Sequence, residues 1–77
     1  MTLKIISAED ILFEGEVSLV NLPGANGQFT VLHNHASLVS TLVPGNVRYV
    51  QDGVEASVPV GGGLVDVDDN VVSVCIY

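Results

Sequence analysis

The sequence predicts an all-β fold, a two-sheet antiparallel β-sandwich or flattened barrel, in a single domain over residues 1–77. Apolar and polar residues alternate with a period of two in several short runs, as half-buried strands require. Valine, whose β-branched side chain favours a pleated strand, is the commonest apolar residue. Turn-forming residues separate the runs, and only residues 36–42 are compatible with a helical turn, which Pro44 limits.

The first half of the chain begins its alternation at residues 16–19, where Val17 and Leu19 flank a serine. Pro23-Gly24 is expected to form a tight turn, followed by a short strand and a loop that carries histidines. A further turn is expected at Pro44-Gly45, ahead of an alternating run at residues 47–49.

The second half contains the best hairpin signal, Asp52-Gly53, which suits a type I′ turn before the alternating residues 54–60. Pro59 inside that run indicates an edge strand or a bulge. Asp69-Asn70 suits a turn less well and precedes the last alternating run, residues 72–76. The residues expected to face the core are Val17, Leu19, Phe29, Val31, Val58, Val60, Val65, Val67, Val72 and Val74.

The composition excludes several classes of protein. Hydrophobic residues make up 48% of the chain and charged residues 14%, so the chain is not disordered and carries more apolar surface than a small domain hides alone. Nine acidic residues against two basic ones, Lys4 and Arg48, argue against nucleic acid and anionic membranes as partners. No apolar run would span a bilayer or act as a signal peptide, so we expect a soluble, unexported protein.

Candidate chemical sites are few. His33 and His35 would share one face of a strand, but nothing nominates a third metal ligand, and a loop or partner contact is the better interpretation. The acidic residues are expected on a solvated surface: Asp66 and Asp68 on a strand face, Asp69 in a turn, and the pair Glu14 and Glu16 on another strand.

Glycine and cysteine also favour structural roles. Residues 61–63 are three glycines, but the acid at Asp66 and the lack of a following Lys-Ser/Thr argue against a phosphate loop and favour a bulge or close backbone approach. Cys75 is expected to be a buried or half-buried inert thiol, and a single cysteine fits a reducing compartment. No catalytic residue, cofactor site or metal site is predicted.

The order of short motifs along the chain resembles the N-terminal domain of the epsilon subunit of F-type ATP synthase. Residues 13–17 are similar to the family's Phe-x-Gly-x-Val, and residues 62–67 to its Gly-Gly-hydrophobic-x-acid-Val strand. Further matching segments are residues 3–9, 22–24, 27–29 and 42–48. The chain departs from the family at His33-Asn34, where Pro-Gly is usual, at Thr30, where Gly is usual, and at Gly61, where Ser is common; His35 keeps the family's His position.

The resemblance implies a non-catalytic sandwich on the central stalk, with no cofactor, that links the gamma subunit to the membrane c-ring and supports proton-driven ATP synthesis. It implies a peripheral membrane location on the cytoplasmic face of the bacterial inner membrane. It places Ser7, His35, Ser40, Gly61, Gly62, Gly63 and Asp66 at the gamma interface, and Asn26, Gly27 and Gln28 at the c-ring interface.

Most family members continue into a C-terminal helical hairpin, whereas this sequence ends at Tyr77 after the last expected strand. We therefore expect either a short member or a shortened chain, without the hairpin and its ATP site. A biotinyl or lipoyl carrier is disfavoured because the one lysine, Lys4, lies in a strand and not in a hairpin turn. A small enzyme is disfavoured because the chain has no nucleophile–base set. A generic acidic β-sandwich adaptor remains an alternative function.

Overall fold

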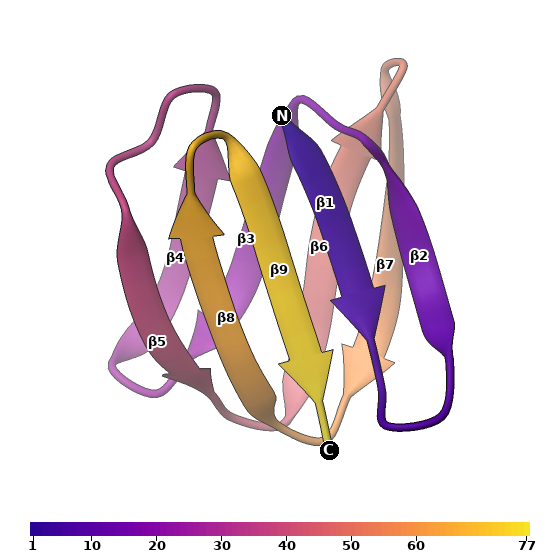
Figure 1. Ribbon diagram of the computed structural model, residues 1–77, viewed down its shortest axis with the longest axis vertical. Coiled ribbons are helices and arrows are strands. Elements are labelled where there is room, and N and C mark those ends of the chain that lie inside the picture. Colours follow the sequence, from indigo (N-terminus) through magenta and orange to yellow (C-terminus); the bar gives the residue numbers. More distant parts are fainter.

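Nine short strands form all the regular structure of the computed structural model, which describes residues 1–77 (Figure 1). Each strand follows the last through a short link, as the spacing of turn residues predicts. Their bounds are β1 Thr2–Ile6, β2 Ile11–Glu16, β3 Leu19–Gly24, β4 Gly27–Leu32, β5 Leu38–Leu42, β6 Gly45–Gln51, β7 Val54–Val60, β8 Gly63–Asp68 and β9 Val71–Ile76.

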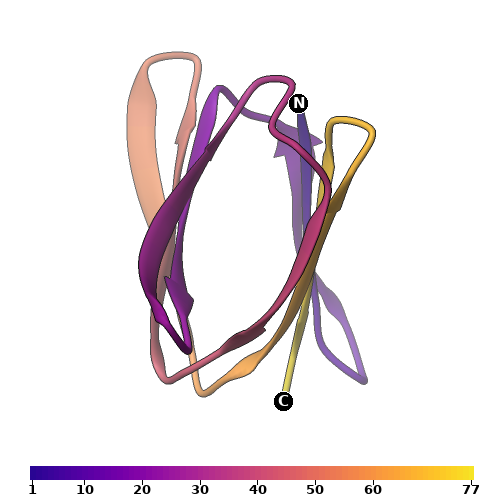
Figure 2. The same ribbon diagram turned by 90° about the vertical axis from the view of Figure 1, so that its left-hand side faces the viewer.

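The strands lie in two facing layers, which Figure 2 shows from the side. The first layer has the order β2-β1-β9-β8-β5, and the second contains β4, β3, β6 and β7. Gly24 of β3 pairs with Leu42 of β5, so the two layers are parts of one curled sheet, a half-barrel. The predicted all-β sandwich is confirmed, with one difference: β1 and β9 run parallel, while every other ladder is antiparallel.

Fourteen buried side chains fill the space between the layers. They are Leu3, Ile5, Val17, Val20, Leu22, Val31, Leu42, Val47, Tyr49, Val60, Val65, Val67, Val72 and Val74. Seven of the ten expected core residues are among them, and Phe29 and Val58 pack against the cluster in partly buried positions. The prediction that Leu19 faces the core is wrong, because Leu19 is only half-buried. The chain crosses between the layers at Val17 and Ser18, and Val20 takes the inward position instead.

Two of the turns have the predicted geometry. Asp52 and Gly53 have φ angles of 51° and 77°, and Asp69 and Asn70 have 49° and 61°. Both central residues of each turn are thus left-handed, as in a type I′ hairpin. The turns join β6 to β7 and β8 to β9, and Pro59 lies on β7, an edge strand, as predicted.

Two local predictions are wrong. Pro23 and Gly24 belong to β3 and pair with Gln28 and Gly27, and the turn is formed by the next two residues, Ala25 and Asn26. Residues 36–42 make no helical turn, because Leu38–Leu42 forms β5 and pairs along its whole length with β8. This pairing satisfies the backbone groups with which β5 and β8 face each other, whereas a helical turn at residues 36–42 would leave that edge of β8 unpaired.

Candidate functional site

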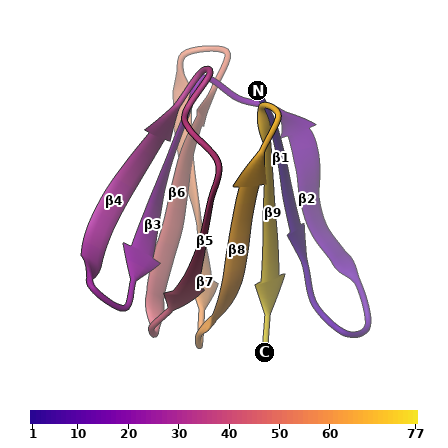
Figure 3. The same ribbon diagram turned by 60° about the vertical axis from the view of Figure 1, so that its left-hand side comes forward.

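The links between strands gather the predicted contact residues at two ends of the sandwich. The β1–β2 link carries Ser7, the β3–β4 link carries Asn26, and the β7–β8 link carries Gly61; all three links lie at the lower end in Figures 1 and 3. The β4–β5 link, which carries His35, lies at the opposite end. The structure thus brings part of the predicted gamma set close to the predicted c-ring turn and separates His35 from both.

Ser40 and Asp66 lie on neighbouring strands but on opposite faces. In the β5–β8 ladder Ser40 pairs with Val65, and Asp66 pairs with Val39. Ser40 shares the inward side of β5 with Leu38 and Leu42 and is half-buried, whereas Asp66 is exposed on the outer face.

The outer face around Asp66 also presents apolar side chains that the sequence prediction missed. Val39 is 72% exposed and Leu64 is 47% exposed. Leu64 shares its face of β8 with Asp66 and Asp68 because residues two apart point to the same side. An apolar residue in an otherwise acidic outward series was the signal available in the sequence, and it marks a surface suited to a protein partner.

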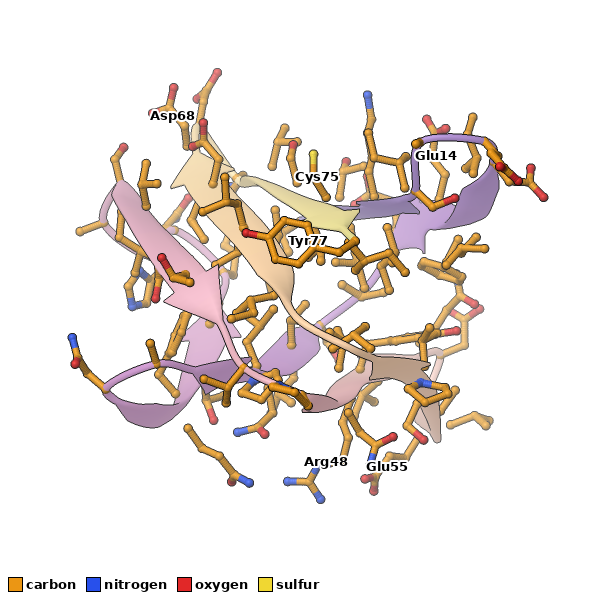
Figure 4. All side chains as sticks on the ribbon, turned by 90° about the horizontal axis from the view of Figure 1, so that it is seen from below. Glu14, Arg48, Glu55, Asp68, Cys75 and Tyr77 are labelled. Carbon is orange, nitrogen blue, oxygen red and sulfur yellow. The ribbon has the colours of Figure 1, made fainter.

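Two of the three glycines, Gly62 and Gly63, serve close packing, as predicted. A Cβ atom on Gly63 would collide with the carbonyl oxygen of Cys75, and Gly63 has a φ of +155°. Gly62 has a φ of +124°, and its carbonyl oxygen accepts a hydrogen bond from the backbone N–H of Tyr77 at 3.3 Å. Figure 4 shows the Tyr77 side chain at this end of the molecule. Gly61 faces open space.

A groove of about 730 Å³ opens beside the predicted c-ring turn, between β3 and β6. We call it the β3–β6 groove. It is lined by Asn21, Pro23, Gly24, Ala25, Gly27, Gln28, Val43, Pro44, Gly45, Asn46 and Arg48. Gln28 and Gly27 therefore belong both to the turn and to the wall of this groove.

The charged side chains lie on the surface of the sandwich, and several of them make polar contacts. Asp66, Asp68 and Asp69 are exposed, as predicted, and Asp68 accepts a hydrogen bond from the Ser37 hydroxyl at 2.7 Å. At the N-terminal end of β1, Glu16 accepts a hydrogen bond from Thr2 Oγ1 at 2.6 Å and lies 3.4 Å from the terminal ammonium of Met1. The Thr2 hydrogen bond and then that ammonium hold the pKa of Glu16 below its ordinary value.

The histidines and the cysteine are placed differently from expectation. His33 and His35 lie in a link in which Asn34 has a φ of 61°, so they do not share a strand face. No group of three or more His, Cys, Asp or Glu side chains is arranged to hold a metal ion. Cys75 is exposed, not buried, because Val72 and Val74 take the inward positions of β9. The structure contains no helix long and apolar enough to cross a membrane.

Known proteins resemble this chain in sequence and in fold. The family model of the ATP synthase delta/epsilon chain beta-sandwich domain matches residues 1–76. The ATP synthase epsilon chain of Desulfitobacterium hafniense is 38% identical over 73 residues, which cover 95% of this chain and 55% of that protein. The epsilon chain of Bordetella petrii is 37% identical over 75 residues, 96% of this chain and 53% of that one. The chain thus spans about half the length of these curated relatives.

Two solved structures share the fold at low sequence identity. A chain of the Euglena gracilis mitochondrial ATP synthase (OSCP/F1/c-ring, rotational state 1) superposes with a TM-score of 0.88 at 23% identity, covering 96% of this chain and 48% of that chain. A chain of the Tetrahymena thermophila mitochondrial ATP synthase central stalk and c-ring gives 0.83 at 13% identity, covering 99% and 62%. With the family match over nearly every residue, the chain belongs to the ATP synthase delta/epsilon chain beta-sandwich domain family.

Proposed function

We propose that this sandwich is a non-catalytic part of the rotor of an F-type ATP synthase, where it links the gamma subunit to the c-ring and supports the coupling of proton flow to ATP synthesis. The observation that carries the proposal is the family match over residues 1–76, together with relatives that are epsilon chains. The two neighbours in fold come from synthase structures whose titles include the c-ring. In this role the protein is peripheral to the membrane, on the cytoplasmic face of a bacterial inner membrane.

Gamma is proposed to dock on the outer face of β5 and β8 and on the adjacent β7–β8 link. Asp66 supplies charge there, and Val39 and Leu64 supply exposed apolar surface. The link lets a partner approach closely because Gly61 is exposed and carries no side chain. Ser7 lies at the same end as this link, and the opposite position of His35 requires gamma to reach along the whole length of β5. Ser40, on the inward side of β5, and the buried Gly62 and Gly63 belong to the proposed set as residues that shape this face from within and do not touch gamma directly.

The c-ring is proposed to meet the β3–β4 turn. Asn26 lies in that turn, and Gly27 and Gln28 are the first two residues of the following strand, β4. The amide of Gln28 is exposed and offers both a donor and acceptors to a polar loop.

Binding to a purified gamma subunit from the same source tests the proposal. Gly61→Trp is the informative variant, because Gly61 has ordinary backbone angles and open space, so the domain is expected to fold normally. We expect a loss of affinity of about tenfold or more, since a large side chain blocks close approach. Val54→Trp, at an exposed site on the other layer, is the matched control and should bind like the wild type. Equal affinity of both variants for gamma would exclude this docking face, and no binding by the wild-type domain would exclude the proposed function.

A further inference from the structure

The β3–β4 turn carries an asparagine that is followed directly by a glycine. Ala25 and Asn26 form the turn and Gly27 begins β4, and all three residues are exposed. The turn lies at the lower end of the sandwich in Figure 3. Gly27 has a φ of +118°, and a Cβ atom placed on it would meet no other atom within 4 Å. The space beside the Asn26–Gly27 peptide bond is therefore open to water.

This setting permits a reaction of the asparagine with its own backbone. The backbone nitrogen of Gly27 forms a bond to Cγ of Asn26, the bond from Cγ to Nδ2 breaks, and Nδ2 leaves as ammonia with the proton of the Gly27 N–H. Water then opens the resulting succinimide ring at one of its two carbonyl carbons. Aspartate forms where the bond from Cγ to nitrogen breaks, and isoaspartate forms where the main-chain bond breaks. The new carboxyl group ionises at neutral pH.

The other four asparagines lack this combination of exposure and a following glycine. Asn21 is held in extended backbone by pairing with both neighbouring strands, β4 and β6. Asn34 and Asn70 are fixed by hydrogen bonds to each other at 2.7 and 2.8 Å. Asn46 lies in β6 and precedes Val47, a fully buried residue whose β-branched side chain crowds the attacking nitrogen. The β3–β4 turn alone joins an exposed asparagine to a residue without a side chain.

The turn adjoins the contact that joins the two layers of the sandwich, which we call the β3–β5 junction. Gly24 pairs with β5 immediately before the turn. The Ala25 N–H donates a hydrogen bond to the Thr41 carbonyl, and the Val43 N–H donates one to the Pro23 carbonyl, both at 2.9 Å. Isoaspartate adds one carbon atom to the main chain beside this junction, whereas aspartate leaves the main chain unchanged.

We propose that Asn26 is a site of spontaneous deamidation in the folded protein, and that the isoaspartate product loosens the β3–β5 junction. The inference goes beyond the proposed function, and it concerns the free chain, so it does not depend on any partner. Each converted chain gains one negative charge in addition to its net charge of −7. The reaction is faster at higher pH, because the attacking nitrogen has to lose its proton.

Mass spectrometry of the full chain after prolonged incubation in neutral and mildly alkaline buffer tests the modification. We expect the fragment with Asn26 to gain the mass difference between an amide and an acid, well ahead of the other asparagines. Asn26→Gln keeps an exposed amide but has to close a larger ring, so conversion at this position should slow by about tenfold or more. If Asn26 reacts no faster than the other asparagines, or reacts in urea but not in the folded chain, the proposal is overturned.

Urea denaturation of the separated products tests the effect on the junction. Asn26→Asp is the matched control, because it carries the new charge on an unaltered main chain at an exposed site, and it should unfold near the wild-type midpoint. The isoaspartate fraction, identified by its reaction with a protein isoaspartate methyltransferase, should unfold at a lower urea concentration. Equal midpoints for this fraction and Asn26→Asp would show that the β3–β5 junction does not respond to the modification.

Discussion

Gly61, Gly62 and Gly63 follow one another in the chain, yet each has different surroundings. Gly61 faces open space, Gly62 lies against the Tyr77 ring, and Gly63 lies against the backbone of Cys75. Only at Gly62 and Gly63 does the backbone take a φ that other residues rarely adopt. The functional meaning of the three positions therefore differs: the first is available to a partner, and the last is fixed by the fold.

Replacing Gly63 by alanine should destabilise the domain. A methyl group would collide with the backbone of β9, and the left-handed φ adds strain, so we expect the free energy of unfolding to fall by about 2–4 kcal/mol. Urea denaturation followed by far-ultraviolet circular dichroism measures the change. Gly61→Ala is the matched control and should shift the free energy by at most about 0.5 kcal/mol. Identical midpoints for the two variants would show that the close contact at Gly63 is absent in solution.

The carboxyl group of Glu16 should titrate below the ordinary value of 4.5, because Thr2 and the terminal ammonium stabilise its charged form. A lowered folded-state pKa stabilises the fold at pH values above 4.5, and this contribution is lost as the pH falls below that value. Thr2→Val removes the largest cause, so the pKa of Glu16 should rise toward 4.5, as an NMR titration of the side-chain carboxyl would report. The stability difference between wild type and variant should shrink in acid, and a difference independent of pH would contradict this assignment.

At the scale of elements, a turn can be predicted from the sequence where its conformation depends only on its own residues. Asp52-Gly53 needs only its own two left-handed residues to form a hairpin. The strand β5 could not be predicted in this way, because Leu38–Leu42 becomes a strand by pairing with β8, which lies far away in the sequence. Pro23 and Gly24 look like a turn but extend β3, because Gly24 pairs with Gly27 of β4 and the two residues between them, Ala25 and Asn26, make the turn.

Two asparagines, Asn34 and Asn70, join two links between strands, a contact that the alternation of apolar and polar residues does not predict. The Asn34 N–H donates to Asn70 Oδ1 at 2.7 Å, and Asn70 Nδ2 donates to Asn34 Oδ1 at 2.8 Å. The Thr2 N–H also donates to the Asn70 carbonyl at 2.9 Å. The β4–β5 link, the β8–β9 turn and the start of β1 are thereby held together.

Glycine variants should measure what the asparagine pair contributes, because glycine accepts the positive φ of both sites. Asn70→Gly loses two hydrogen bonds and should lower the free energy of unfolding by about 1–3 kcal/mol, and Asn34→Gly loses one and should lower it by about 0.5–1.5 kcal/mol. Urea denaturation of both single variants and the double variant gives the coupling. The shared bond should appear as a coupling of about 0.5–1.5 kcal/mol. Strictly additive losses would mean that the side chains do not contact each other in solution.

At the scale of the whole molecule, the fold class and most of the core were predictable, because they depend on alternation along single strands. The arrangement of contact residues was not, because it depends on which links share an end and which faces point outward. Ser40 and Asp66 illustrate this: they lie on paired strands, and only the register shows that their side chains face opposite sides. The β3–β6 groove lies between two strands that are not consecutive in the chain, so no single stretch of sequence encodes it.

Gln28→Ala tests the uncharged contact proposed between the β3–β4 turn and the c-ring. Loss of one amide hydrogen bond is expected to weaken c-ring binding by about 0.5–1.5 kcal/mol, roughly two- to tenfold. The loss should be nearly the same at low and moderate salt, since no charge is removed. Titration of the c-ring with the gamma-bound variant measures it, with Leu32→Ala as the control, because Leu32 is exposed at the far end of the same strand and does not line the groove. An unchanged affinity would move the docking end away from this turn.

The parallel ladder between β1 and β9 has a consequence for how the domain folds while it is being synthesised on the ribosome. Thr2 pairs with Val71 and Ile6 with Cys75, so β1 finds one of its two neighbours only when β9, far later in the chain, has emerged. Closing a loop of that length before any contact rewards it slows folding. Until then, β1 carries Leu3 and Ile5, both fully buried in the finished domain, with one side of its backbone unpaired. Until β9 has been synthesised, the nascent domain is therefore expected to expose an apolar strand with an unpaired edge, which favours aggregation of the incomplete domain.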